Sequence, residues 1–288
     1  MLASAELALL RRLRIVRRRP AAGLYPGEHR SRRASRSPEF SDFRAYVPGD
    51  DFRHLDWRAF GRLERLLLRL YVAEDEVCLN LVVDASASMA TGAPAKWAAG
   101  RRLAAALSFL GLAGMDRVAV GVLRRGGEHT GHLRGSSSLG LLERFLGRIR
   151  PAGEGGLEDL FSLQWLKPGI TVVLSDFLTE GETASPPRLG SLRDRGQELV
   201  LWQLLAPDEA SPELVGDVRL VGPERGRERE LTVTAELVKD YLGALRTHQG
   251  SLAGAAQTGG GSFLSSLSSD DLLTLMRRGV AAGIIRQA

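Results

Sequence analysis

Short apolar runs alternate with helical patterns over most of the chain. Four runs rich in Val, Leu and Ile are each short enough to form a strand buried on both faces, namely Val77–Val83, Arg117–Leu123, Ile170–Ser175 and Leu199–Leu205. Helical patterns occupy the intervals, at Lys96–Gly114, Leu139–Ile149, Glu158–Leu166 and Leu189–Arg195. The alternation predicts an α/β fold with a doubly wound, mostly parallel sheet covered by helices on both faces. Right-handed crossovers then place the carboxyl end of every strand at one edge of this sheet.

The last part of the chain continues this alternation. Leu231–Val233 has the pattern of a strand, Thr234–Arg246 that of a helix capped by its threonine, and Ser269–Arg278 that of a second helix. The triplet Gly259-Gly260-Gly261 predicts a turn, because it lacks the lysine and the strand-to-helix setting of a phosphate-binding loop. We therefore assign residues 77–288 to one sheet domain.

Residues 38–76 have a different texture and are predicted to form an extended segment packed on the sheet domain. Opposite charges predict ion pairs that pin this segment, with aromatic side chains as its apolar anchors. The charged residues are Arg44, Asp50, Asp51, Arg53, Asp56 and Arg58, and the aromatic ones are Phe43, Tyr46 and Trp57. The same charges could instead form a recognition surface or a hydrolytic pair of carboxylates. Their balance and the three aromatics favour the structural role.

The formal net charge of +5 has a local origin in residues 1–37, a basic N-terminal arm. Its arginines face only Glu6 and Glu28; they are Arg11, Arg12, Arg14, Arg17, Arg18, Arg19, Arg30, Arg32, Arg33 and Arg36. Such an arm can meet nucleic acid, acidic lipid or an acidic protein. No nucleic-acid motif or aromatic ladder accompanies the charge, so we favour a solvated arm.

The 288 residues, 44% of them hydrophobic, include a single cysteine, Cys78, which lies inside the first apolar run. A disulfide framework and a cysteine-based metal site are therefore excluded, which suits a reducing cytoplasm. The first apolar stretch precedes its arginines, the reverse of a secretory signal, and Leu103–Met115 is too short to span a bilayer. We expect a cytoplasmic protein without a membrane anchor.

Candidate chemistry gathers where two predicted strands end. Asp84, Ser86 and Ser88 follow the first apolar run directly, and Asp176 follows the third. Because a parallel sheet brings both strand ends to one edge, these carboxylates and hydroxyls can converge as hard oxygen ligands for Mg²⁺ or Mn²⁺. The alternative is that the first three residues only cap the next helix. The matching position of Asp176 favours the site.

The string Asp84-x-Ser86-x-Ser88-Met89 resembles the metal-ion-dependent adhesion site of von Willebrand factor A domains, with Asp176 in the place of the later aspartate. In that family, an acidic group of the partner completes the coordination of the cation. The stretch from Glu39-Phe40 through Pro48-Gly49-Asp50-Asp51 to Leu55-Asp56-Trp57 resembles the signature of the bacterial domain of unknown function 58 family. This resemblance covers nearly the whole chain. It implies a von Willebrand factor A-like, Rossmann-type fold and a partnership with MoxR-type AAA+ ATPases.

One position departs from the family pattern. Where the family site draws a threonine from a Gly-Gly-Thr loop, this chain has Gly155-Gly156-Leu157, and leucine cannot coordinate a cation. Either the site binds metal weakly, or Glu158 or Asp159 substitutes, or the edge binds its partner without metal. The edge is therefore a partner-binding surface first and a cation site second.

The sequence offers little for catalysis. The histidines do not fall at ligand spacing, no Gly-x-Ser-x-Gly elbow occurs, and Cys78 lies on a buried strand. We expect a non-enzymatic interaction module, and the resemblance implies that it binds a MoxR-type ATPase or its client in the assembly or maturation of a protein complex. The alternatives are a metal-dependent phosphoester hydrolase that uses the same aspartates, and nucleic-acid binding by the basic arm.

Overall fold

The computed structural model describes residues 2–16, 39–47, 50–52, 55–72, 78–114, 116–124, 126–178, 189–224 and 226–287. The chain divides into two compact units, which we call the sheet unit (residues 1–22 and 77–288) and the small unit (residues 23–76). Most of the basic arm, residues 17–37, lies outside the described residues, as do Arg53 and His54.

The sheet unit is built on five parallel strands in the order β10-β7-β6-β4-β5. The strands are β4 (Cys78–Val83), β5 (Arg117–Val122), β6 (Gly169–Ser175), β7 (Gln197–Leu205) and β10 (Ser262–Leu267). The doubly wound parallel sheet predicted from the alternating pattern is thus confirmed, and its four predicted strands are β4 to β7. The edge strand β10 was not among the predicted strands, because its serines interrupt the apolar run by which the other strands were recognised.

The order of the strands reverses next to β4. From β4 the chain crosses to β5 on one side, and it then returns to place β6 on the other side of β4. In doubly wound sheets, ligands bind outside the carboxyl ends of the strands at the point where the order reverses. In this chain that point lies between the ends of β4 and β6.

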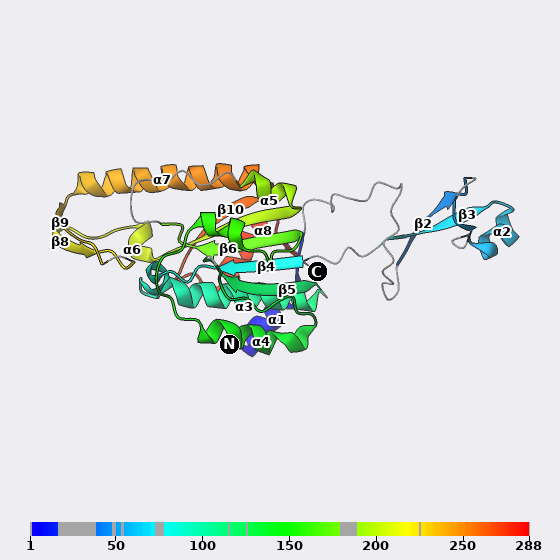
Figure 1. The fold of residues 1–288 in the computed structure, drawn as a ribbon, viewed down its shortest axis with the longest axis horizontal. Helices are drawn as coiled ribbons and strands as arrows, with labels where there is room; N and C mark the ends of the chain where they lie inside the picture. The colour runs from blue at the N-terminus through cyan, green and yellow to red at the C-terminus, as the bar shows by residue number, and fades with distance from the viewer. Residues whose placement is uncertain are drawn as a thin grey trace. The chain divides into compact units, whose positions relative to one another are not determined.

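Helices cover both faces of the sheet (Figure 1). One face forms a hydrophobic cluster with α1 (Ser4–Leu10), α3 (Lys96–Ala113), α4 (Leu139–Arg148) and α8 (Leu272–Ala281). The other face forms a second cluster with η4 (Leu157–Ser162), α5 (Gly190–Asp194) and α7 (Ala235–Thr258). The short strand β1 (Leu13–Ile15) pairs with β11 (Ile285–Gln287). The first part of the predicted basic arm is therefore a folded part of the sheet unit.

The prediction of an α-helix over Glu158–Leu166 is wrong. The segment instead contains the 3₁₀ helix η4, Leu157–Ser162. A 3₁₀ helix has three residues per turn, so Leu157, Leu160 and Leu163 lie on one side, and all three are buried. The same leucine spacing mimics an α-helical pattern in the sequence.

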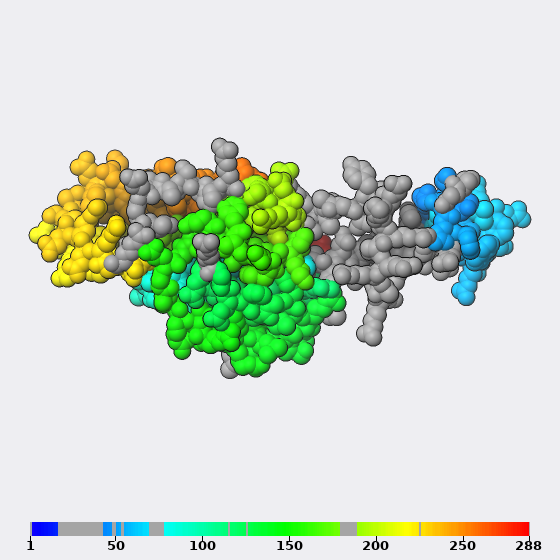
Figure 2. Space-filling view, in the orientation of Figure 1, coloured from blue at the N-terminus to red at the C-terminus, as the bar shows by residue number. Residues whose placement is uncertain are grey.

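An extension follows β7. The short helix α6 (Pro207–Ala210) comes directly after the end of β7, and the hairpin of β8 (Gly216–Val221) and β9 (Glu228–Val233) then leads into α7. The hairpin and the start of α7 project beyond the sheet, at the left of Figures 1 and 2. α7 continues past its predicted end because Leu252 and Ala256 are buried in the second cluster, and such packing stabilises a helix beyond its intrinsic propensity.

The small unit contains the antiparallel pair β2 (Glu39–Ala45) and β3 (Leu67–Val72) and the helix α2 (Trp57–Leu63). Asp56 caps α2, because its carboxylate accepts hydrogen bonds from the backbone amides of Arg58 and Ala59 at 2.9 and 3.1 Å. Arg44 pairs with Asp50 at 2.8 Å. The predicted anchor Trp57 is exposed in the described chain. The packing of this segment on the sheet domain stays a prediction.

Candidate partner-binding edge

Asp84 and Asp176 lie where the strand order reverses. Each follows its strand directly, and the backbone amide of Asp84 donates to the carbonyl of Leu174 in β6 at 2.8 Å. Their side chains are almost completely buried, with 3% and 1% exposed. The structure thus brings the two sequence-predicted aspartates to the same edge of the sheet.

The loop after β4 is folded around the carboxylate of Asp84. One carboxylate oxygen accepts the backbone amide of Ser86 at 2.8 Å, and the other accepts the hydroxyl of Ser175 at 2.5 Å. The hydroxyls of Ser86 and Ser88 are hydrogen-bonded to each other at 2.9 Å. Neither the 3₁₀ helix η2 (Ala87–Ala90) nor α3 receives a side-chain cap from these residues. The capping alternative is therefore wrong for the two serines.

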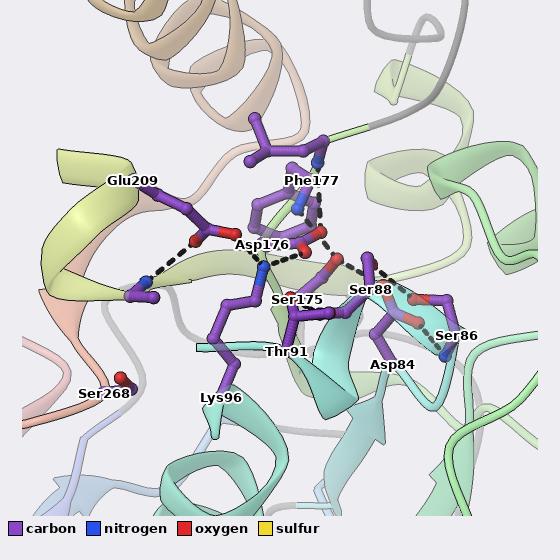
Figure 3. Close-up of polar contacts among 12 residues, drawn as sticks. Asp84, Ser86, Ser88, Thr91, Lys96, Ser175, Asp176, Phe177, Glu209 and Ser268 are labelled. Carbon is purple, nitrogen blue, oxygen red and sulfur yellow. Dashed lines mark hydrogen bonds and ion pairs between the residues drawn. The ribbon is translucent and has the colours of Figure 1, made fainter. Parts of the chain in front are cut away.

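Lys96 also belongs to this site, and it was not predicted from the sequence. Its ammonium lies 2.7 Å from the carboxylate of Asp176 and also pairs with Glu209 of α6, as Figure 3 shows. The lysine side chain is 1% exposed. The other carboxylate oxygen of Asp176 accepts the backbone amide of Leu178 at 3.1 Å. A buried ammonium thus faces two carboxylates at the edge.

Burial and mutual charge set the protonation of this cluster. Burial, followed by the negative charge of Asp176, raises the pKa of Asp84 to about 6, although hydrogen bonds from Ser175 and Ser86 work in the opposite direction. Burial works to lower the pKa of Lys96, but the ion pairs with Asp176 and Glu209 outweigh it, and the net direction is upward. Lys96 is therefore charged at neutral pH.

The backbone after Asp176 is strained. Phe177 has a φ of 55°, a left-handed conformation that a bulky residue rarely adopts. Its amide donates to the Ser175 hydroxyl at 2.9 Å, and its carbonyl lies 2.8 Å from a ring nitrogen of His248 in α7. Strain of this kind persists where the surroundings fix the backbone, and it clusters at functional sites.

The loop before η4 approaches the site through its backbone. The carbonyl of Gly153 accepts the amide of Ala87 at 2.9 Å. Gly155 lies so near that a β-carbon added to it would stand 3.2 Å from a carboxylate oxygen of Asp84. Leu157 is buried in the second hydrophobic cluster. Glu158, the predicted substitute ligand, is exposed, and its carboxylate turns back over Gly156.

The arrangement does not fit a firmly held divalent cation. Each carboxylate oxygen of Asp84 and Asp176 already accepts a hydrogen bond from the protein, and the charged Lys96 lies on Asp176. Across the described ranges, no group of three or more His, Cys, Asp or Glu side chains is arranged to hold a metal ion. The roles of Asp84, Ser86, Ser88 and Asp176 as metal ligands stay a prediction.

A second buried polar cluster lies at the opposite end of the same strands. The side-chain amide of Asn80 in β4 donates to the Lys167 carbonyl at 2.8 Å and lies 3.1 Å from the Thr171 hydroxyl in β6. Thr171 in turn donates to Gln197 in β7 at 2.5 Å, and His132 lies 2.9 Å from the Asn80 oxygen. Burial, followed by nearby positive charges, lowers the pKa of His132 to about 4. This cluster is neutral at physiological pH.

Comparison with known proteins gives a family and several relatives without known function. The family described as "Protein of unknown function DUF58" matches residues 42–251. An uncharacterized protein of Mycobacterium tuberculosis is 28% identical over 286 residues, which cover 96% of this chain and 89% of the relative. Among solved structures, the conserved hypothetical protein BatB from Bacteroides thetaiotaomicron matches with a TM-score of 0.43 at 14% identity, over 71% of this chain and 97% of BatB. The SpRpn10 VWA domain matches with a TM-score of 0.40 at 8% identity, over 70% and 93%.

No helix in the described part of the chain has the length and apolar character needed to cross a membrane.

Proposed function

The chain belongs to the DUF58 family of proteins of unknown function, and we propose that its sheet unit is a non-enzymatic module that binds a protein partner at the carboxyl edge. The observation that carries this proposal is the buried charged cluster of Asp84, Asp176 and Lys96 at the point where the strand order reverses. Charges are costly to bury and add little stability even when paired, so their presence at a ligand-binding edge points to function.

The buried groups organise the edge, and the neighbouring loops offer the contact surface. Ser86 and Ser88 are 2% and 8% exposed, so little of either is open to a partner. Thr91 after η2 and Glu158 in η4 are exposed beside them. In this proposal, Asp84, Ser86, Ser88 and Asp176 hold these loops in place, and the partner touches the loops.

A hydrolase is the weaker proposal. Metal-dependent phosphoester hydrolysis needs a bound ion that activates water and clamps the reacting oxygens. The internal hydrogen bonds of Asp84 and Asp176, and the ammonium on Asp176, leave these carboxylates engaged with the protein. We therefore place partner binding ahead of catalysis.

We further propose that the partner is a MoxR-type AAA+ ATPase or its client, that the complex serves the assembly or maturation of a larger protein complex, and that it forms in the cytoplasm. The resemblance of residues 39–57 to the family signature implies this partner, and the family match over residues 42–251 supports the resemblance itself. The basic arm gives no comparable support for nucleic acid as the main partner, since no nucleic-acid motif or aromatic ladder accompanies its charge.

The proposal is tested by calorimetric titration of the purified chain with the MoxR-type ATPase of the same genome. Glu158→Lys reverses an exposed charge at the edge and is expected to weaken binding by about tenfold. The matched control is Asp194→Lys, which reverses an exposed charge just before β7, at the amino end of the sheet. Equal affinities of both variants and the parent chain would show that the partner does not bind at this edge. Turnover of a phosphoester substrate that disappears with Asp84→Asn would replace the interaction module with an enzyme.

A further inference from the structure

We infer that Lys96 is the built-in cation of the edge, and that it supplies the positive charge which a divalent metal ion would otherwise supply to Asp176. The inference deepens the proposed function, because it rests on this edge being the binding surface and states how the surface is held together. An edge of this kind meets its partner without a metal ion.

The first support is the buried negative charge of the cluster, which needs a positive partner. Three carboxylates of the cluster, those of Asp84, Asp176 and Glu209, come from the ends of β4 and β6 and from α6. A carboxylate buried without a positive partner is strongly disfavoured. Lys96 is the partner that the structure provides, since its ammonium contacts both Asp176 and Glu209.

The second support is the place of Lys96 in its own helix. Lys96 is the first residue of α3, and no acidic residue stands in the first turn of that helix. The amino end of a helix carries a partial positive charge, so a cation is disfavoured there. The chain nevertheless keeps a fully buried lysine at this position. The contacts with Asp176 and Glu209 explain why a lysine is found at a position where the helix dipole disfavours a positive charge.

The third support is the network beyond the lysine. The second carboxylate oxygen of Glu209 accepts the backbone amide of Ala206 at 2.8 Å, at the exit of β7. The carbonyl of Glu209 accepts the hydroxyl of Tyr241 in α7 at 2.7 Å. Lys96 therefore links the end of β6 to α6 and, through α6, to the projecting extension. A metal ion held by Asp84, Ser86 and Ser88 alone would make no such link.

The test measures Mn²⁺ binding by calorimetry and by electron paramagnetic resonance, without any partner. The parent chain is expected to bind no Mn²⁺ at this edge at millimolar concentration. Lys96→Ser frees the carboxylates and adds a hydroxyl, and it is expected to gain Mn²⁺ affinity by about tenfold or more. Lys96→Arg keeps the charge and should gain nothing. Adding Asp176→Asn to Lys96→Ser should abolish the gain.

The outcomes separate clearly. If the parent chain binds Mn²⁺ tightly and loses it with Asp84→Asn, Lys96 is not the cation of the edge and the inference is overturned. The inference also fails if Lys96→Ser remains folded and gains no affinity. Should Lys96→Ser be unfolded in the absence of metal, recovery of its circular dichroism spectrum on addition of Mn²⁺ supports the inference, and no recovery opposes it. Because no partner is present, failure here leaves the proposed interaction to its own test.

Discussion

The two ends of β4 and β6 carry buried polar clusters of opposite character. At the amino end, Asn80 and Thr171 belong to a neutral network that also includes His132 and the first residue of β7. At the carboxyl end, Asp84 and Asp176 belong to a charged network that includes Lys96. The strands are the same and the burial is similar, so the difference lies in the charge that each end carries.

The two networks also differ in what they contribute to stability. A satisfied neutral hydrogen bond adds on the order of 1 kcal/mol to stability. The neutral network therefore helps to fix the register of adjacent strands at little cost. A buried ion pair gives no net gain over well-packed apolar side chains. Stability therefore does not account for the charges at the carboxyl end, and the proposed partner binding would account for them.

Removal of Lys96 should have the largest effect on stability. Lys96→Met leaves the buried carboxylate of Asp176 without its positive partner, and such a loss costs about 3–5 kcal/mol of the free energy of unfolding. Urea denaturation measures the change. Combining Lys96→Met with Asp176→Leu removes both charges and should restore most of the stability. A cost below about 1 kcal/mol for Lys96→Met would end the distinction between the two clusters.

The pH dependence of stability should differ in sign between the two ends. The pKa of Asp84 is raised to about 6, so the folded state keeps a proton that the unfolded chain has already lost. The contribution of Asp84 to the free energy of unfolding therefore falls as the pH rises from about 4 to about 6, by on the order of 3 kcal/mol. Asp84→Asn cannot lose this proton. The difference between the parent chain and this variant, measured by denaturation across that range, should show the fall.

His132 provides the contrast, because its pKa is lowered to about 4. As the pH falls, His132 binds a proton in the unfolded chain at a higher pH than it does in the folded protein. The contribution of His132 to stability is therefore present above about pH 6.5 and is lost as the pH falls towards 4. The effect should reach only on the order of 1 kcal/mol, since His132 is half-buried and solvent screens its charge. His132→Gln isolates this slope. Slopes of the same sign for Asp84 and His132 would contradict the assignment.

The part of the edge that follows from hydrophobic periodicity could be predicted from the sequence. Apolar runs locate β4 and β6, and a parallel sheet then brings the residues after them to one edge, which places Asp84 beside Asp176. The strand β10 was not predicted, because edge strands tolerate polar residues and Ser262–Leu267 contains three serines. The length of α7 was predicted too short, because tertiary packing extends this helix.

Lys96 could not be found in the same way. Its partners Asp176 and Glu209 are 80 and 113 residues further along the chain. A lysine at the start of a helix is ordinarily a solvated residue, and no local pattern shows that its side chain is buried. The only signal was its position as a cation in the first turn of a helix, where a positive charge is unfavourable and no acidic residue accompanies it. That signal acquires meaning once the edge is known.

A change in the neutral cluster should affect stability alone. Asn80→Ala removes the hydrogen bonds to Lys167, Thr171 and His132. The His132 ring nitrogen then loses its partner, whereas the Thr171 hydroxyl and the Lys167 carbonyl keep their hydrogen bonds to Gln197. The expected loss is about 2 kcal/mol of the free energy of unfolding, measured by urea denaturation. Titration with the proposed ATPase should give the affinity of the parent chain. A loss of affinity without a larger loss of stability would assign function to the amino end and break the comparison.

The smallest effect on stability is expected at the far end of the charged network. Tyr241→Phe removes the hydroxyl that donates to the carbonyl of Glu209, and the side chain is 37% exposed, so the cost should not exceed about 1 kcal/mol. If α6 and Lys96 hold the edge together, the affinity for the partner should still fall, by about threefold. Thr247→Val is the matched control, because that hydroxyl donates only within α7, to Gly243 at 3.0 Å. Equal affinities for the two variants would confine the functional edge to Asp84, Asp176 and Lys96. A selective loss with Tyr241→Phe would extend the functional edge to α7, which this hydroxyl joins to α6 through the carbonyl of Glu209.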